Sequence, residues 1–209
     1  TKLRAHSAEV VRAGENYESS MEAAQKAATE NGWVLLSDSS WEGYIEIPHR
    51  LMEGYLVMAA EAVEQAPQTP THIFLQAGVG GLATAAAAYF RHAWGTEPVI
   101  IVVEPESAPA IFNSIIAGKA TNTPGAVSNM GRLDCKEPSL IALKGLARDA
   151  DMFALISDET AEQAMPVLST KGLATTPSGG AGLAALLSGF PDIDQTSRVL
   201  CILSEESDT

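Results

Sequence analysis

The stretch QAGVGGLATAAAA (76–88) combines residue types that suit the binding of a phosphate group. It follows the β-branched run THIFL and leads into alanines, which favour a helix. A glycine-rich turn between a strand and a helix directs backbone N–H groups and the positive end of the helix dipole toward a bound anion. Neither Lys nor Arg lies between His72 and Arg91, so backbone amides would hold the phosphate. The GK[ST] ending of a Walker loop is missing as well.

Two kinds of cofactor fit these letters. The spacing Gly78-x-Gly80-x-x-Ala83 matches the dinucleotide fingerprint, and Glu104, 21 residues after Ala83, ends the next predicted strand, where a ribose hydroxyl would bind. The same glycines also suit the phosphate of pyridoxal phosphate. A purely structural alternative is that they only allow a tight turn and close packing of the helix on the sheet. A phosphate-binding module without catalysis is a further alternative.

Strand and helix patterns alternate around this loop. The periodicity predicts strands at 8–13, 33–38, 71–76, 98–104, 152–156 and 198–203. It predicts helices at 17–32, 47–66, over the alanine-rich segment, and at 108–117, 138–149, 158–169 and 179–188. This alternation predicts a three-layer α/β fold, in which helices cover both faces of a mostly parallel sheet. A polar link at 38–48 is the predicted discontinuity.

The composition argues against several classes of function. Lys plus Arg number 13 against 26 Asp plus Glu, and the resulting net charge of −13 opposes binding to nucleic acid or to an anionic membrane. Cys135 and Cys201 form no metal-binding or disulfide pattern, so we predict no metal site and a reducing compartment. The sequence shows no signal peptide and no apolar run of about 18 residues. We expect a cytoplasmic protein whose partner is a small molecule.

Five motifs carry a resemblance to a known family. SDSSWEGYIEIP, LQAGVGGLA, IIVVEPESA, MGRLDCKEPS and PSGGAGLAAL occur in this order and resemble the diaminopropionate ammonia-lyases, of the tryptophan-synthase-β-like class of pyridoxal phosphate enzymes. The resemblance covers nearly the whole chain. It implies that fold, pyridoxal 5'-phosphate rather than NAD, an amino-acid substrate and a homodimer. It implies α,β-elimination of 2,3-diaminopropionate to pyruvate and ammonia. A threonine or serine dehydratase is the near alternative, and a dinucleotide-binding oxidoreductase domain the distant one.

The resemblance also implies roles for single residues. Ser204 would contact the pyridine nitrogen of the cofactor, and Asp38 would be an active-site carboxylate that binds the second ammonium group of the substrate. Trp41 and Tyr44 would line the pocket around Asp38, and Ser178 is a plausible N-cap of the following helix. The cofactor phosphate would be held by the loop residues Gly78, Val79, Gly80, Gly81 and Leu82.

Two motifs that the resemblance implies are missing. One contains the lysine that forms the Schiff base, and the other is an asparagine-containing DGNHG loop. The lysines present stand in no such setting; they are Lys2, Lys26, Lys119, Lys136, Lys144 and Lys171. We therefore expect the chain to be part of a longer enzyme and inactive alone. Residues 1–38 would be the tail of the smaller cofactor domain, and 39–209 part of the larger one.

Overall fold

The computed structural model describes residues 2–14 and 17–207. The chain forms two compact units, Thr1–Ser37 and Asp38–Thr209. This boundary lies one residue before the predicted one, so Asp38 belongs to the second unit. The candidate site is built from residues of that unit.

The first unit contains two helices, α1 (Lys2–Ala5) and α2 (Tyr17–Asn31). The helix predicted at 17–32 is confirmed, but the strands predicted at 8–13 and 33–38 are wrong, because both segments lie outside regular structure. The apolar side chains of Val11, Trp33, Val34 and Leu36 are 64–79% exposed. An alternating apolar pattern favours an extended chain, but a strand forms only where a neighbouring strand accepts its hydrogen bonds.

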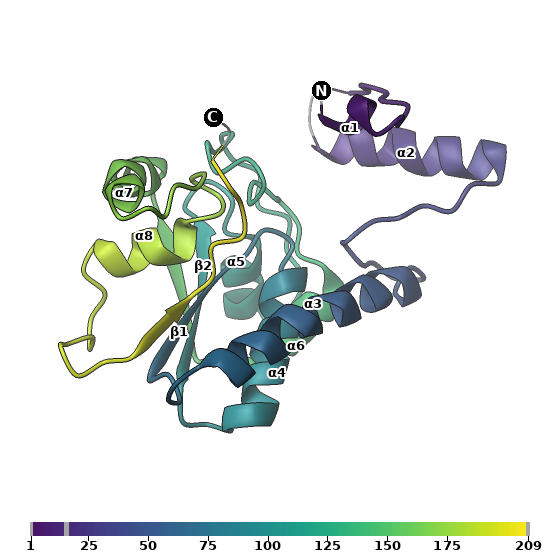
Figure 1. Ribbon diagram of the computed structural model, residues 1–209. Helices are drawn as coiled ribbons and strands as arrows, with labels where there is room; N and C mark the ends of the chain where they lie inside the picture. The colour runs from purple at the N-terminus through teal and green to yellow at the C-terminus, as the bar shows by residue number, and fades with distance from the viewer. Residues whose placement is uncertain (1, 15–16, 208–209) are drawn as a thin grey trace. The chain divides into compact units, whose positions relative to one another are not determined.

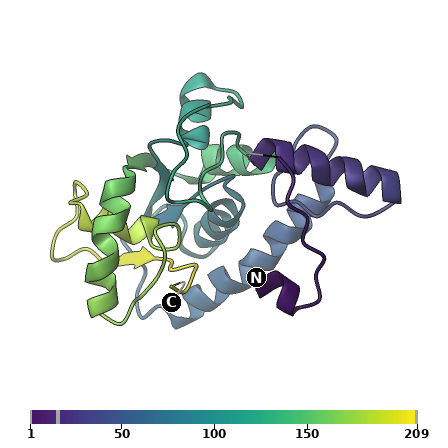
Figure 2. The same ribbon diagram turned by 90° about the horizontal axis from the view of Figure 1, so that it is seen from above.

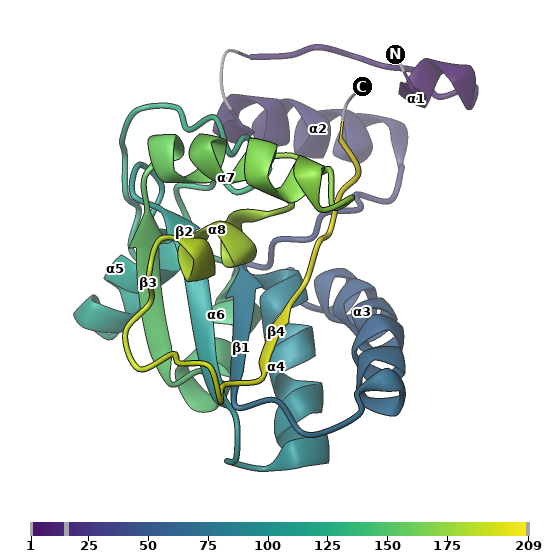
Figure 3. The ribbon, with the colours of Figure 1, turned by 60° about the vertical axis from the view of Figure 1, so that its left-hand side comes forward.

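The second unit is built on a parallel sheet of four strands (Figure 3). The strands lie in the order β3-β2-β1-β4, and β1 is paired on both sides, with His72 opposite Val99 and Val199. Their bounds are β1 (His72–Gln76), β2 (Val99–Pro105), β3 (Met152–Ile156) and β4 (Val199–Cys201). Each strand coincides with a predicted one to within two residues at either end.

Helices cover both faces of this sheet (Figures 1 and 2). Ile73 and Leu75 point into one core, with helices α3, α4 and α6, whereas Phe74 points into the other, with α7 and α8. The three-layer prediction is therefore confirmed. None of the helices in the described part of the chain is both long and apolar enough to span a membrane. The helices are α3 (Glu46–Gln65), α4 (Gly81–Trp94), α5 (Ala110–Ala117), α6 (Leu140–Asp149), α7 (Asp158–Thr170) and α8 (Ala181–Leu187).

Candidate cofactor site

The glycine loop, residues 78–82, leaves β1 and enters α4 at the carboxyl edge of the sheet. Gly80 caps the helix with a left-handed backbone (φ 95°). The first N–H donor of α4 with an acceptor in the described chain is that of Thr84, which binds the carbonyl oxygen of Gly80 at 2.9 Å. The six N–H groups from Gly78 to Ala83 donate to no described residue. With the helix dipole behind them, these donors suit an anion.

Neighbouring segments explain two of the glycines. A side chain on Gly78 would meet the carbonyl oxygen of Arg132 at 2.9 Å and the Cα of Leu133 at 3.1 Å, both backbone atoms that cannot swing aside. A side chain on Gly80 would meet Cδ1 of Ile111 at 2.7 Å, in addition to the strain of its positive φ. Residues Arg132, Leu133 and Ile111 thus pack against the glycine loop, while the N–H groups of the loop find no acceptor in the described chain.

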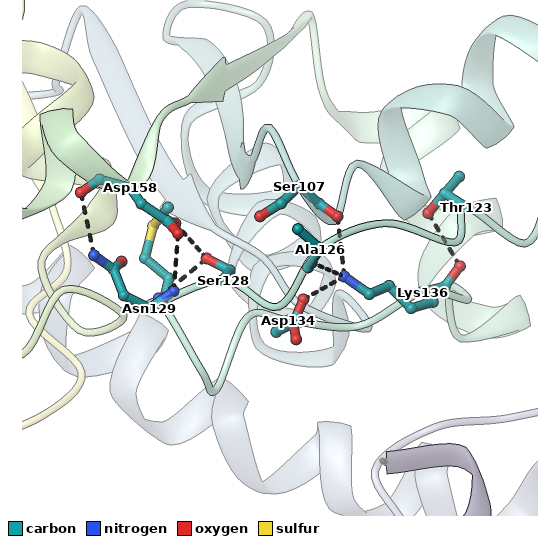
Figure 4. A network of polar contacts seen from close by, with 9 residues as sticks. Ser107, Thr123, Ala126, Ser128, Asn129, Asp134, Lys136 and Asp158 are labelled. Carbon is teal, nitrogen blue, oxygen red and sulfur yellow. Dashed lines mark hydrogen bonds and ion pairs between the residues drawn. The ribbon is translucent and has the colours of Figure 1, made fainter. Parts of the chain in front are cut away.

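The wall beside Gly78 belongs to the MGRLDCKEPS motif and is fixed by Lys136 (Figure 4). The Lys136 ammonium donates to the carbonyl oxygens of Ser107 at 3.0 Å and Ala126 at 2.8 Å, and it pairs with Asp134 Oδ1 at 2.5 Å. Its side chain is only 15% exposed. This cation therefore ties the turn after β2 to the segment that presses on the glycine loop.

The same wall is fixed at a second point. The Asp158 carboxylate, at the start of α7, accepts the Ser128 hydroxyl at 2.5 Å and the Asn129 N–H at 3.0 Å (Figure 4). Asp158 and Lys136 thus hold the connection between α5 and α6 on both sides of Gly131. A Cβ added at Gly131 would meet no atom within 4 Å.

A hydrogen bond from Gln76 links Ser204 to the end of β1, two residues before the glycine loop. Gln76 was not identified as a site residue from the sequence. The side-chain Nε2 of Gln76 shares its two hydrogens among three acceptors, the carbonyl oxygens of Gly179 at 2.9 Å and Ile202 at 3.0 Å and Ser204 Oγ at 3.1 Å. Gln76 is the last residue of β1 and is buried. One amide thus holds the PSGGAG turn and the segment after β4 beside the glycine loop.

The PSGGAG turn itself departs from the prediction. Ser178 is no N-cap, because α8 begins at Ala181 with Gly180 as its cap. The Ser178 hydroxyl instead accepts the N–H of Arg132 at 3.2 Å. The turn is therefore fixed to the wall of the glycine loop rather than to its own helix.

Asp38 lies next to the glycine loop. Its carbonyl oxygen stands 3.8 Å from the position that a Cβ on Gly81 would take, and Cε2 of Tyr55 stands 3.9 Å from the same point. Burial raises the pKa of Tyr55, and the Asp38 charge contributes to the same shift. The Asp38 side chain is exposed and forms no hydrogen bond or ion pair with the described residues. The backbone of Asp38 thus lies beside the loop, and its carboxylate, which has no partner in the described chain, lies close enough to Tyr55 to act on that hydroxyl.

Trp41 and Tyr44 lie in the same segment as Asp38. Their rings stack with centroids 4.3 Å apart, and their backbones form a bridge. Trp41 lines a pocket of about 210 Å³ together with Ser40, Asn122 and Glu137. Neither Asp38 nor Tyr44 lines this pocket, so the expectation that both rings surround Asp38 stays a prediction.

Glu104 does not offer the ribose contact of a dinucleotide site. The residue is 1% exposed, and its two carboxylate oxygens accept the N–H groups of Ile111 at 2.8 Å and Phe112 at 2.7 Å. These are donors at the start of α5, which the carboxylate satisfies in place of an N-cap side chain. Glu104 thus holds α5, and with it Ile111, against Gly80.

Glu104 predicts a pH dependence of stability. Burial raises its pKa from 4.5 to about 7, although the two N–H donors act in the opposite direction. The folded state therefore binds the Glu104 proton more tightly than the unfolded state does. The contribution of this proton to the free energy of unfolding is fully present below about pH 4.5 and is lost as the pH rises through about 7. As the pH rises from about 5 to about 7, we expect the free energy of unfolding of the native protein to fall, relative to that of Glu104→Gln, by up to about 1.4 kcal/mol per pH unit.

Urea unfolding between about pH 5 and pH 8 measures this difference. Glu61→Gln is the control, because Glu61 is an exposed acid on α3. A difference between native and Glu104→Gln proteins that stays constant over this range would contradict the prediction.

The lysines of the chain stand in structural or surface settings. The Lys136 ammonium donates hydrogen bonds to three oxygens, and Lys26 pairs with Glu30 on α2 at 3.8 Å. Lys144 is exposed in a groove of about 450 Å³ between α3, α4 and α6. Lys119 and Lys171 are exposed as well. The side chain of Lys2 lies outside the described residues.

Known proteins resemble this chain in sequence and in fold. Residues 1–205 match the model of a family described as pyridoxal-phosphate dependent enzymes. The diaminopropionate ammonia-lyase of Salmonella typhimurium is 33% identical, over 99% of this chain and 57% of that protein. The crystal structure of diaminopropionate ammonia lyase from Escherichia coli in complex with an aminoacrylate-PLP azomethine reaction intermediate has a TM-score of 0.84 at 30% identity, over 91% of this chain and 54% of that one.

A more distant structure shares the fold alone. The processed form of threonine deaminase isoform 2 from Solanum lycopersicum has a TM-score of 0.85 at 18% identity, and the match covers 98% of this chain and 58% of that one. The three-layer arrangement is therefore common to proteins whose names differ in substrate.

Fold and site together define an α/β protein with a group of backbone N–H donors, suited to an anion, at the carboxyl edge of a parallel sheet. The chain belongs to the family of pyridoxal-phosphate dependent enzymes. It spans about half the length of the curated relatives it matches. Pyridoxal phosphate is the cofactor of this family, and the residues present fit it: the six N–H groups without acceptors in the described chain are the donors that a phosphate requires.

Proposed function

We propose that the whole protein is a pyridoxal phosphate-dependent ammonia-lyase that eliminates ammonia from 2,3-diaminopropionate. The observation that carries this proposal is Asp38, whose backbone carbonyl lies beside Gly81 and whose exposed carboxylate has no partner in the described chain. Similarity to the diaminopropionate ammonia-lyase of Salmonella typhimurium supports the same substrate. The products would be pyruvate and two molecules of ammonia, because the enamine left by elimination hydrolyses.

In this proposal the glycine loop holds the cofactor phosphate. Its donors are the backbone N–H groups of Gly78, Val79, Gly80, Gly81 and Leu82, which find no acceptor in the described chain. When bound, pyridoxal phosphate supplies the electron-withdrawing group that makes the α-proton of an amino acid acidic. The wall beside Gly78 keeps water away from one side of these donors, which strengthens their electrostatic attraction for the phosphate.

Ser204 would contact the pyridine nitrogen. Its Oγ accepts a hydrogen bond from Gln76 Nε2, so its own proton remains available for a ring nitrogen. A neutral hydroxyl does not enforce protonation of that nitrogen as a carboxylate would. This suits elimination, in which a full electron sink in the ring is not required.

Asp38 would select the diamine. A substrate with a second ammonium group gains a charge-assisted hydrogen bond from a nearby carboxylate, worth about 1.5–3 kcal/mol. Threonine and serine carry a neutral hydroxyl at the same place and need no carboxylate. The charge of Asp38 therefore favours the ammonia-lyase over the dehydratase alternative.

Turnover of 2,3-diaminopropionate and of threonine by the whole protein tests this proposal. We expect a higher kcat/KM for the diamine, measured as pyruvate or 2-oxobutyrate formed per unit time. A preference for threonine would show instead that the protein is a dehydratase of the same fold.

We also predict where the Schiff-base lysine lies. None of the lysines with described side chains stands in the setting of a nucleophile: Lys136 is saturated by three oxygens, and the others are exposed or paired with an acid. Borohydride reduction of the whole protein followed by peptide mapping should place the pyridoxyl group on a lysine outside this chain. A stoichiometric adduct on Lys136 or Lys144 would contradict this prediction.

The remaining proposals concern organisation. We propose that the first unit, Thr1–Ser37, belongs to a smaller cofactor domain and that the second unit belongs to a larger one, a division one residue before the 38/39 boundary predicted from the sequence. We propose a homodimer in the cytoplasm; Cys135 and Cys201 form no disulfide in the described chain, which supports a reducing compartment. Sedimentation at micromolar concentrations and cell fractionation test these two points.

A further inference from the structure

Two buried serine hydroxyls lie between the glycine loop and the segment that carries Asp38. Ser139 is 0% exposed and Ser40 is 2% exposed. Their Oγ atoms are 2.6 Å apart, and the N–H of Ser40 donates to Ser139 Oγ at 3.0 Å. The two residues are 99 positions apart in the sequence, so only the fold brings them together.

Ser139 is fixed directly to the glycine loop. Its N–H donates to the carbonyl oxygen of Val79 at 3.0 Å. Val79 is one of the residues whose own N–H has no acceptor in the described chain. A shift of Ser139 would therefore move a carbonyl of the loop, and with it the direction of the neighbouring N–H donors.

Ser40 is fixed to the start of α6. Its Oγ accepts the N–H of Ile141 at 2.9 Å, and its carbonyl oxygen accepts the N–H of Leu140 at 3.0 Å. The side chain of Ser139, which is the N-cap residue of α6, makes no capping hydrogen bond. Ser40 thus caps a helix that belongs to a distant part of the sequence, satisfying two of its orphan donors.

Helix α6 is in turn held against α4, which begins at the glycine loop. The Thr84 hydroxyl donates to the carbonyl oxygen of Ala142 at 3.1 Å. Gly145 lets the two helices approach so closely that a Cβ there would stand 2.3 Å from Cγ2 of Thr84. Ser40, the start of α6 and the start of α4 therefore form one rigid set of contacts.

Asp38 depends on this set for its position. Its side chain forms no hydrogen bond or ion pair with the described residues, so its backbone neighbours decide where the carboxylate stands. Ser40 is two residues away, and on its other side the backbone bridge between Trp41 and Tyr44 fixes the chain direction. The hydroxyl pair is thus an anchor between the segment that carries Asp38 and the glycine loop.

We propose that Ser40 and Ser139 are positioning residues that fix the distance between the Asp38 carboxylate and the glycine loop, and so set the preference for a substrate with a second ammonium group. The preference for a diamine substrate rests on the proposed function. The positioning role of Ser40 and Ser139 does not rest on it, because that role concerns only the geometry of two backbone segments.

The test uses the whole protein with Ser40→Ala, Ser139→Ala and the double substitution. Ser114→Ala is the matched control, because Ser114 is 1% exposed and its hydroxyl also accepts one backbone N–H, but it donates to a carbonyl oxygen within α5 and not to a second hydroxyl. We measure the ratio of kcat/KM for 2,3-diaminopropionate to that for serine. We also measure thermal stability and the exchange rates of the Trp41 and Ile141 amide protons.

We expect each single alanine variant to lower the ratio by about 10-fold or more, because a misplacement of about 1 Å in a binding group costs up to about 100-fold. The double variant should be no worse than the poorer single one, because the two hydroxyls act as a unit. Ser40→Thr, which keeps the hydroxyl, should retain more of the native ratio. The Trp41 and Ile141 amide protons should exchange faster in Ser40→Ala and Ser139→Ala than in Ser114→Ala.

Two results would overturn the inference. The first is a native ratio of kcat/KM in Ser40→Ala and Ser139→Ala, together with a loss of thermal stability equal to that of Ser114→Ala. This result would show that the two hydroxyls form an ordinary structural contact. Unchanged amide exchange would refute the positioning itself, whatever the activity. If the native whole protein fails to turn over the diamine, the proposed function is wrong, and amide exchange alone then decides the positioning.

Discussion

Asp38→Asn in the whole protein should lower kcat/KM for 2,3-diaminopropionate by about 10- to 100-fold. The substitution keeps the size of the side chain and removes its charge, so the second ammonium group of the substrate loses a charge-assisted hydrogen bond of about 1.5–3 kcal/mol. Cofactor affinity should change little, because only the carbonyl oxygen of Asp38 lies near the glycine loop, and the substitution leaves that oxygen in place.

Steady-state kinetics with the diamine and with serine, together with a cofactor titration, measure both effects. Glu42→Gln is the control, since Glu42 is an exposed acid in the same segment. Unchanged kinetics with the diamine in Asp38→Asn would remove Asp38 from the site.

Gly78→Val should weaken cofactor binding by about 100-fold. The new side chain would collide with the backbone of Arg132 and Leu133, at 2.9 and 3.1 Å. We expect the glycine loop to be displaced, because Lys136 and Asp158 hold the opposing segment. Two misdirected N–H donors to a phosphate cost about 3 kcal/mol together, and each 1.4 kcal/mol is a factor of ten.

A fluorescence or absorbance titration of the apo-protein with pyridoxal phosphate gives this dissociation constant. Gly131→Ala is the matched control, because a Cβ there meets nothing within 4 Å although it belongs to the wall beside Gly78. Native affinity in Gly78→Val would mean that the phosphate lies elsewhere.

The strands and helices of the second unit could be predicted because their signals are local. A β-branched run followed by glycines and alanines specifies β1, the loop and α4 in consecutive residues, and the periodicity is visible in the sequence. The prediction failed at 8–13 and 33–38, where a strand-like pattern finds no neighbouring strand in the described chain. An extended preference is local, whereas hydrogen bonding between strands is not.

Several residues of the candidate site could not be predicted, for the same reason. Gln76, Ser40 and Ser139 act through partners about 100 positions or more away in the sequence. A single buried amide or hydroxyl leaves no periodic pattern, and in the sequence it looks like any other polar residue. The hydrogen bonds of Lys136 to Ser107 and Ala126 could not be predicted either, because they depend on two loops meeting.

The pairing of β1 with β4 bears on the order in which the site is completed during synthesis. Gln76 and Ser204 are 128 residues apart, so the hydrogen bond between them closes one of the longest loops in the chain. The glycine loop and α4 leave the ribosome long before β4 is made, and contacts of high sequence separation form slowly. The glycine loop is therefore present in the nascent chain before Ser204 is made. In the proposed site, the contact of Ser204 with the cofactor would form only after β4 and the segment that follows it have emerged.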